Sequence, residues 1–157
     1  TEGADLVVLS LHWGTQYQHE PDGYQQQVAA AVLPSDVDVI IGCHAHVVQP
    51  ISKVAGTYVV WGMGNQLANQ PEVPRSDGLT VQLTARPDAS GRWRVAGIEA
   101  IPTYVDTSDF RVYPVVRTLA DRRISPALRA ALAASYDRTA GVLGSVRTEG
   151  VTLAPKP

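Results

Sequence analysis

The stretch VIIGCHAHVVQP (residues 39–50) places two of the chain's four histidines within three residues. Its apolar start belongs to the run DVDVIIG (36–42), whose Val and Ile residues are typical of a strand buried on both faces. The run breaks at Gly42, and His44 and His46 follow almost at once. Two interpretations are open: a metal-binding loop at the end of a buried strand, or polar residues in an ordinary turn.

An earlier part of the chain predicts a second strand and a helix. DLVVLSLHWG (5–14) is another nearly continuous apolar run that ends in glycine. After a polar loop, apolar residues at helical spacing predict a helix from about residue 22 to 33, stopped by Pro34. The order strand, helix, strand predicts a right-handed βαβ crossover, so the two strands run parallel.

Parallel strands bring their carboxyl ends to one edge of a sheet, where ligand sites of open α/β sheets form. His12 ends the first strand, and His44 and His46 lie just past the end of the second. In an extended segment, a His-x-His pair projects both imidazoles to one side. Three imidazoles with an open position suit Zn²⁺, Mn²⁺ or iron. The residues therefore predict a metal cluster, with solvated loop histidines as the alternative.

Carboxylates are less well placed for such a site. Asp5, Asp36 and Asp38 sit at the amino ends of the strands, on the opposite edge. Glu20 and Asp22 lie on the same edge as the histidines, but we interpret them as a solvated loop charge and a helix N-terminal charge. The sequence thus offers no convincing carboxylate to bridge two metals.

Other candidates have two interpretations each. Asn65 ends a third strand (56–66) and could bind a metal or phosphate oxygen, but a turn role is favoured. Cys43 is expected to be a small buried residue rather than a thiolate ligand. Arg75 lies in the Pro-rich loop 67–78, a predicted rim or lid, and is either an anion-binding residue or a surface arginine.

Three further side chains have simpler expectations. Trp13 and Trp61 stand beside strand ends, where they are expected in the core or in a pocket wall. His19 is expected to be an exposed loop histidine.

The second half of the chain predicts antiparallel structure. Segments 79–86 and 92–105 alternate apolar and polar residues, as in a hairpin with one solvated face. Residues 109–116 form a short strand or extended segment. Ser125 and the proline after it open a predicted helix to residue 144, and the tail TLAPKP is expected to fray.

Composition bounds the class of protein. The 157 residues are 45% hydrophobic and 18% charged, which predicts a folded globular domain rather than a disordered chain. The order strand, helix, strand makes the expected fold class α/β. A net charge of −2 and the lack of a basic run predict no nucleic-acid partner. The apolar runs are shorter than the roughly 20 residues of a membrane span. The single cysteine excludes an intrachain disulfide. Because the chain begins without Met, we expect it to be cut from a larger protein.

Four segments together resemble a known family. In order and spacing they are similar to the second half of the poly-γ-glutamate capsule biosynthesis (CapA-type) proteins, a branch of the calcineurin-like metallophosphoesterases. The resemblance covers about residues 3–105, on LSLHWGTQY, DVDVIIGCHAHVVQPI, YVVWGMGNQ and RSDGLTVQL. The superfamily's final motif is Gly-His-x-His; this family often has Gly-His-His-Pro-His, so Cys43 stands where its first histidine would be and Ala45 where its proline would be.

The resemblance implies a fold and a set of ligands. Residues 1–120 would be the C-terminal half of a metallophosphoesterase-like domain, a partial αββα sandwich, and residues 121–157 its C-terminal helix and tail. The implied cofactors are divalent metal ions (Mn, Zn or Fe), two in the full-length protein. His12 and His44 would bind one metal and His46 the other. Asn65, Trp13 and Arg75 would lie near the substrate or behind the ligands.

The implied function is a metal-dependent hydrolase that cleaves a phosphoester or an amide bond. Its partners would be an anionic polymer or phosphoester substrate and membrane-associated capsule machinery, at the bacterial cell envelope or extracellular face. Gln16 stands where the family commonly has Glu, and Gln66 where it has Phe. The superfamily's Asp-x-His, Gly-Asp and first Gly-Asn motifs are absent from this chain, so we expect the fragment alone to be inactive. Two alternatives remain: a non-catalytic capsule-assembly or polyanion-binding component, and a fragment that folds poorly because a strand edge is exposed.

Overall fold

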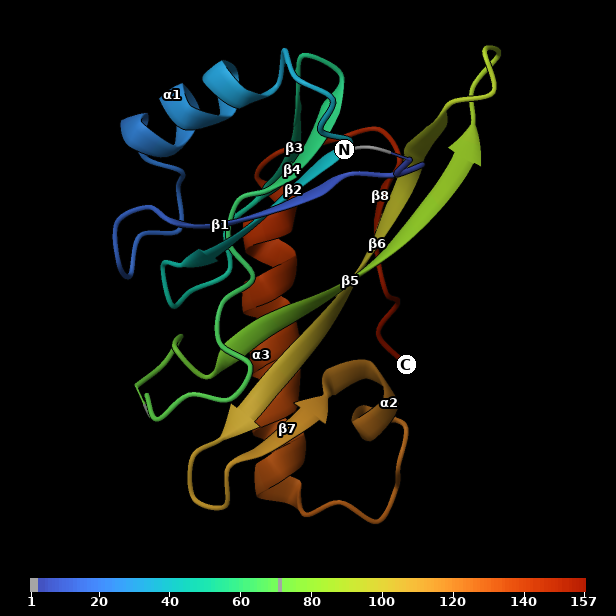
Figure 1. Cartoon of the computed structure of the whole chain (residues 1–157). Coiled ribbons are helices and arrows are strands. Elements are labelled where there is room, and N and C mark those ends of the chain that lie inside the picture. The colour runs from blue at the N-terminus through green and yellow to red at the C-terminus, as the bar shows by residue number, and fades with distance from the viewer. Residues whose placement is uncertain (1–2, 71) are drawn as a thin grey trace.

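The computed structural model describes residues 3–70 and 72–157, and the predicted crossover begins its first sheet (Figure 1). The three elements are β1 (Val8–Trp13), α1 (Gly23–Val32) and β2 (Val39–His44). β1 and β2 pair in parallel, with Val8 opposite Val39 and Trp13 opposite His44. The crossover therefore brings the ends of both strands to one edge, as the sequence predicts.

Local hydrogen bonds define the start of α1. Asp22 is the N-cap: its side chain accepts a hydrogen bond of 2.8 Å from the backbone N–H of Gln25, and the Gln25 side chain accepts one of 3.0 Å in return. This capping box satisfies two backbone donors that the helix itself cannot. The helix ends at its C-cap Leu33, directly before Pro34. Both bounds agree with the prediction from sequence.

A hairpin completes the first sheet. β3 (Ile51–Val54) and β4 (Thr57–Val60) are antiparallel, and β4 also pairs in parallel with β2, giving the order β1-β2-β4-β3. The predicted third strand corresponds to β4, whereas β3 was not predicted. The turn between them uses Ala55 and Gly56, both with positive φ (50° and 85°), the backbone that a tight two-residue hairpin turn favours. An Ala-Gly turn is a weak sequence signal for such a hairpin.

The second sheet confirms the predicted long hairpin. β5 (Asp77–Pro87) and β6 (Trp93–Asp106) are antiparallel, and β7 (Arg111–Pro114) and β8 (Val151–Leu153) both pair with β6. The expectation that the tail frays is wrong. β8 runs parallel to β6, and the N–H of the buried Ala154 donates a 2.9 Å hydrogen bond to the Ala100 carbonyl. A three-residue strand is too short to show a hydrophobic period.

The main core lies between the two sheets. Val39, Tyr58 and Val60 of the first sheet are buried in one cluster with Leu79 and Ile98 of the second. Beyond the first sheet, α1 packs on its other face. Helix α2 (Val115–Leu119) and helix α3 (Pro126–Gly144) pack together and against the second sheet. The fold class is thus mixed α/β, a partial α/β sandwich, as expected.

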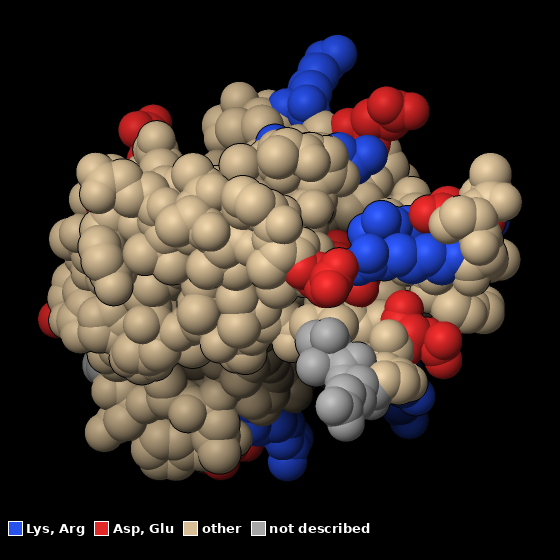
Figure 2. Space-filling view, turned by 45° about the horizontal axis from the view of Figure 1, so that its top comes forward, with Lys and Arg blue, Asp and Glu red and all other residues tan. Residues whose placement is uncertain are grey.

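Charge is unevenly spread over the surface. Figure 2 shows charged side chains gathered on one side of the molecule, while the other side of that view carries none over a wide area. The uncharged side includes α1, whose sequence GYQQQVAAAV has no Lys, Arg, Asp or Glu. Among the described residues, no helix combines the length and the apolar character that crossing a membrane requires.

Candidate functional site

The three predicted histidines lie together at the carboxyl edge of the first sheet. The ring centroids of His12 and His44 are 4.4 Å apart, and those of His44 and His46 are 6.3 Å apart. His12 lies near the end of β1, and in the parallel register its neighbour on β2 is Cys43. The crossover thus brings together side chains that are 32 positions apart in the sequence.

The backbone reason for this convergence differs from the expected one. The His-x-His segment is not simply extended, because His44 and His46 have φ values of 102° and 58°. Such positive φ values are uncommon outside glycine, cost on the order of 1–3 kcal/mol each, and cluster at functional sites. Two strained residues therefore aim the imidazoles, where an alternating strand was expected to do so.

Gly42 also has a different role from the expected turn. It lies inside β2, where an added Cβ would come within 2.0 Å of the Trp61 carbonyl oxygen and 2.3 Å of the Trp13 indole nitrogen. Glycine is needed at this position so that the strand can approach the two tryptophans.

His46 is oriented by Asn65. Nδ1 of His46 lies 2.8 Å from Oδ1 of Asn65, whose side chain is buried. The Asn65 amide nitrogen donates to the carbonyls of Arg75 (2.8 Å) and His46 (3.4 Å). Because those carbonyls can only accept, the amide oxygen must face His46, and Nδ1 of His46 is the donor. Nε2 is then left with its lone pair, the form of histidine that binds metals.

The favoured turn role for Asn65 is therefore wrong, since its side chain holds His46 and Arg75. Its backbone is fixed as well: the Asn65 N–H donates to the Asp77 carbonyl at 3.1 Å. The buried Asp77 carboxylate binds Arg138 of α3 through contacts of 2.6 and 2.8 Å. This pairing raises the pKa of Arg138. Helix α3 thus supports the site through one ion pair.

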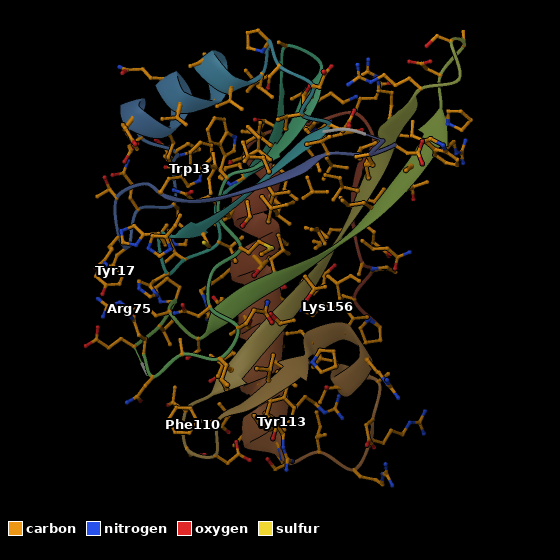
Figure 3. All side chains as sticks on the ribbon, in the orientation of Figure 1. Trp13, Tyr17, Arg75, Phe110, Tyr113 and Lys156 are labelled. Atoms are coloured by element: carbon orange, nitrogen blue, oxygen red, sulfur yellow. The ribbon has the colours of Figure 1, made fainter. Side chains whose placement is uncertain are left out.

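A tyrosine that sequence reasoning missed borders the site. The N–H of Tyr17 donates a 2.7 Å hydrogen bond to the Ala45 carbonyl, between the two histidines. Its ring stacks on His46 with centroids 5.9 Å apart. The guanidinium of Arg75 lies over the same ring, 3.8 Å from its centroid. Figure 3 shows Tyr17 and Arg75 next to each other at this end of the molecule. A tyrosine in a polar loop has no periodicity that would single it out.

Cys43 adds sulfur to the cluster. It is half-buried rather than buried as expected, and its Sγ lies 3.6 Å from Nδ1 of His12. The same sulfur lies 3.4 Å from the Leu11 carbonyl oxygen, to which its S–H donates.

Trp13 is a core residue that lies next to His12 in the sequence and opposite His44 in the strand register. Only 4% of its surface is exposed. Its ring stacks on Trp61 with centroids 5.4 Å apart, and its indole N–H donates to the Trp61 carbonyl at 2.9 Å. The alternative, a position in the core, is confirmed for both tryptophans.

His19 differs from its expected exposed position. It is half-buried, and its Nδ1 donates a 2.8 Å hydrogen bond to the carbonyl of Val48. This bond ties the loop after β1 to the loop after β2, although His19 is not one of the three clustered histidines.

The carboxylates near the histidines have structural roles. Asp22 accepts hydrogen bonds from the N–H of Gln25 and the hydroxyl of Thr15, and these lower its pKa. The charge stabilises the helix N-terminus, as interpreted from the sequence. Glu20 is exposed.

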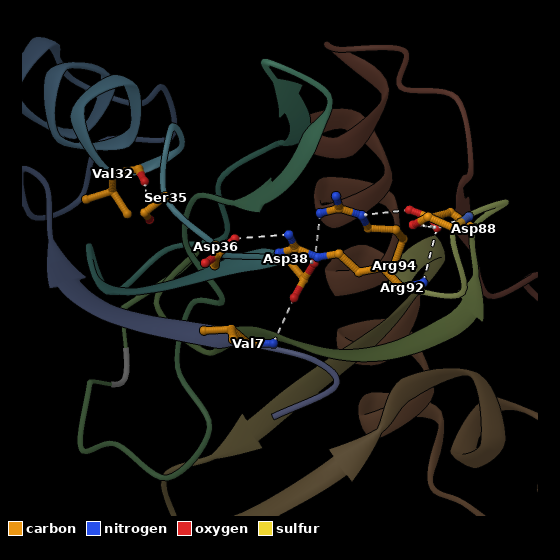
Figure 4. A network of polar contacts seen from close by, with 9 residues as sticks. Val7, Val32, Ser35, Asp36, Asp38, Asp88, Arg92 and Arg94 are labelled. Atoms are coloured by element: carbon orange, nitrogen blue, oxygen red, sulfur yellow. Dashed lines mark hydrogen bonds and ion pairs between the residues drawn. The ribbon is translucent and has the colours of Figure 1, made fainter. Parts of the chain in front are cut away.

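Asp36 and Asp38, at the opposite edge, belong to an ion-pair network (Figure 4). Asp38 is buried and accepts hydrogen bonds from the N–H of Val7 (2.9 Å) and from Arg94 (3.2 Å), and Asp36 pairs with Arg92 at 3.0 Å. These carboxylates are therefore used to join the first sheet to the β5–β6 hairpin.

Within residues 3–70 and 72–157, no three His, Cys, Asp or Glu side chains form a group that could hold a metal ion by themselves. The imidazoles are close together, and Nε2 of His46 is left without a hydrogen on it because Asn65 binds Nδ1.

Comparison with known proteins finds relatives of the segment that carries this site. The model of the family described as "Bacterial capsule synthesis protein PGA_cap" matches residues 1–70, which include the three histidines and Asn65. The "PGA biosynthesis protein CapA" of Bacillus subtilis (strain 168) is 33% identical over 119 residues, 74% of this chain and 31% of the relative. The "Capsule biosynthesis protein CapA" of Bacillus anthracis is 32% identical over 83 residues, 53% of this chain and 20% of the relative. The matched part thus spans less than a third of either relative.

Proposed function

The chain belongs to the bacterial capsule synthesis protein family, and from this premise we propose that it carries part of the metal site of a metal-dependent hydrolase. The bond cleaved is a phosphoester or an amide. The observation that supports the proposal best is the clustering of His12, His44 and His46 at the carboxyl ends of two parallel strands. Ligand sites of open α/β sheets form at this edge.

Each histidine has a proposed role. His12 and His44, with ring centroids 4.4 Å apart, would hold one divalent ion, Mn²⁺, Zn²⁺ or Fe²⁺. His46 would hold a second through Nε2, because Asn65 binds its Nδ1. A bound ion of this kind lowers the pKa of a water ligand and stabilises negative charge on oxygen. The protein's own contribution is to aim the imidazoles and to keep His46 in one tautomer.

The remaining ligands are proposed to come from other parts of the full-length protein. The matched segment covers 31% of the Bacillus subtilis relative, so a larger protein has room for them. The bridging carboxylate is the main missing group, because Asp22 is used as a helix cap. We place the full-length protein at the cell envelope, with capsule machinery at the membrane as its partner.

The substrate is proposed to be anionic, an acidic polymer or a phosphoester. Arg75 lies at the rim of the histidine cluster, where a guanidinium suits carboxylate and phosphate groups. The same arginine supports a second candidate function, a non-catalytic component that binds the capsule polyanion during assembly. If variants that lose the metal also lose capsule formation, the hydrolase is supported over the non-catalytic component.

The test measures metal bound by the full-length protein after loading with Mn²⁺ or Zn²⁺, using elemental analysis. We expect the double variant His44→Ala/His46→Ala to lose the metal and the control His19→Ala, which removes a nearby histidine, to retain it. Metal retained by a folded double variant contradicts the ligand assignment. The same proteins are then assayed for hydrolysis of a phosphodiester and of poly-γ-glutamate, which tests the hydrolase. Capsule formation that survives the double variant favours the non-catalytic component.

A further inference from the structure

Tyr17 is held by the segment that carries His44 and His46, here called the histidine loop, rather than by its own loop. Its N–H donates to the Ala45 carbonyl at 2.7 Å, and its backbone has a positive φ of 66°. A bulky residue in this conformation persists where its surroundings over-determine it. The strained backbone keeps the Tyr17 ring against His46, although the residue is 43% exposed.

The Tyr17 ring in turn restrains Arg75. The guanidinium lies 3.8 Å from the ring centroid, a cation–π contact. The Arg75 carbonyl accepts a 2.8 Å hydrogen bond from the Asn65 amide, which also faces His46. The side chain and the backbone of Arg75 are therefore both tied to groups that contact His46.

A carboxylate already lies on this arginine. Glu72 forms an ion pair with Nη1 of Arg75, while 68% of the Glu72 side chain is exposed. Exposed pairs of this kind contribute little. An external oxyanion can therefore displace Glu72 at small cost, because the planar edge of the guanidinium can donate two parallel hydrogen bonds to a carboxylate or phosphate.

We propose that Tyr17 is a positioning residue that holds Arg75 beside His46 as an oxyanion seat, which Glu72 occupies until a substrate carboxylate or phosphate replaces it. The proposal deepens the proposed function, because it assigns an anion-binding position at the rim of the same histidine cluster. It concerns the chain's own residues and does not require a bound metal.

The experiment titrates the 157-residue chain, in the presence of a metal chelator, with inorganic phosphate and separately with a γ-linked glutamate trimer. Binding is followed through the NMR signals of the Arg75 Nε–H and the His46 ring. We expect Tyr17→Leu and Arg75→Gln to weaken binding about tenfold, which corresponds to about 1.4 kcal/mol of binding free energy. Tyr17→Phe, which keeps the ring, should bind as the unaltered chain does.

Two further variants sharpen the test. Glu72→Gln removes the competing carboxylate and should strengthen binding, whereas Glu149→Gln removes an exposed charge on the C-terminal turn and serves as its control. Equal affinity in Tyr17→Leu and the unaltered chain, with both folded by thermal unfolding, overturns the proposal. So does a Glu72→Gln variant that binds no better than Glu149→Gln. Stronger binding of the glutamate trimer identifies a carboxylate seat, and stronger binding of phosphate identifies a phosphate seat.

Metal content separates this proposal from the proposed function. In the full-length protein, Tyr17→Leu should keep its metal, because the histidines remain, while anion affinity falls. Loss of metal in Tyr17→Leu would mean that the ring supports His46 alone and would overturn the role assigned to Arg75. Failure of the metal assay with retained anion effects would instead overturn the proposed function and leave the anion seat intact.

Discussion

The side-chain amide of Asn65 accepts a hydrogen bond of 2.8 Å from Nδ1 of His46, and this contact determines which nitrogen of the imidazole carries the proton. Asn65 can do so because its other amide atom donates to the Arg75 carbonyl at 2.8 Å. One buried amide thus connects the histidine loop to the Pro-rich loop that carries Arg75.

Replacement of Asn65 by alanine should therefore change the His46 tautomer. We expect nitrogen NMR to find Nδ1 protonated in the unaltered chain and a mixture of tautomers in Asn65→Ala. The variant should also lose about 1–3 kcal/mol of stability, because buried polar groups lose their partner. Gln66→Ala is the matched control: it removes the adjacent amide, which bonds to Leu79 and Thr103, and should leave the tautomer unchanged. An unchanged tautomer in both variants contradicts the role of Asn65.

Asp77→Asn should destabilise the protein by about 1.5–3 kcal/mol, the range for hydrogen bonds to charged groups. The Asp77 side chain is 4% exposed and binds Arg138 through two contacts, so its partner is left with a poorer acceptor. Asp121→Asn breaks the Arg123 pair, in which the arginine side chain is 90% exposed, and should change stability much less, because exposed ion pairs contribute little. Urea unfolding of the two variants measures the difference. Equal losses of stability in the two variants would contradict the idea that burial makes the Asp77–Arg138 pair the stronger one.

Gly42→Ala should destabilise the chain by about 3 kcal/mol, a cost typical of severe overpacking. The new Cβ would meet the Trp61 carbonyl at 2.0 Å, which the strand cannot avoid without moving. Gly141→Ala in α3 is the contrasting change: its Cβ meets nothing within 4 Å, and helix propensity predicts a gain of about 0.5–1 kcal/mol. Thermal unfolding should therefore move in opposite directions. A tolerated Gly42→Ala would show that this part of β2 can shift.

The hairpin turn after β5 should respond to acid. Hydrogen bonds from the side chain and backbone of Ser90 lower the pKa of Asp88 to about 2. An aspartate in an unfolded chain has a pKa of about 3.9. Because the folded pKa is the lower one, the stabilisation by this carboxylate is complete above about pH 4 and is lost as the pH falls toward 2.

A carbon NMR titration of the Asp88 carboxyl group measures this pKa directly. We expect Ser90→Ala to move the value upward toward that of an unfolded aspartate, since the first of the two causes is removed. A Ser90→Ala variant in which Asp88 still titrates near 2 would assign the shift to other groups.

Much of the fold follows from local patterns in the sequence. The buried run before Gly42, the Asp22 cap and the stop at Pro34 define the crossover, and parallel pairing then brings His12 to the same edge as His44. The alternating segments likewise predict the β5–β6 hairpin. These features depend on residues that are close in the sequence, so hydrophobic period and turn chemistry are sufficient to find them.

Contacts between distant residues could not be predicted in this way. β8 pairs with β6 across about 50 positions, and Asp77 binds Arg138 across 61. No local sequence pattern in β8 or around Asp77 indicates which distant residues they contact. The roles of individual polar residues depend on such partners, which is why Asn65 was interpreted as a turn residue and His19 as exposed.

The sequence by itself determined the crossover, the hairpin and the histidines that meet at one sheet edge, because strand direction alone places strand ends. Only the tertiary structure decided how those histidines are aimed. The positive φ values of His44 and His46, the bond from His46 to Asn65, and the contact of Tyr17 with Arg75 each join loops that are separate in the sequence. Their geometry is fixed by packing and hydrogen bonding between these loops, which no local pattern encodes.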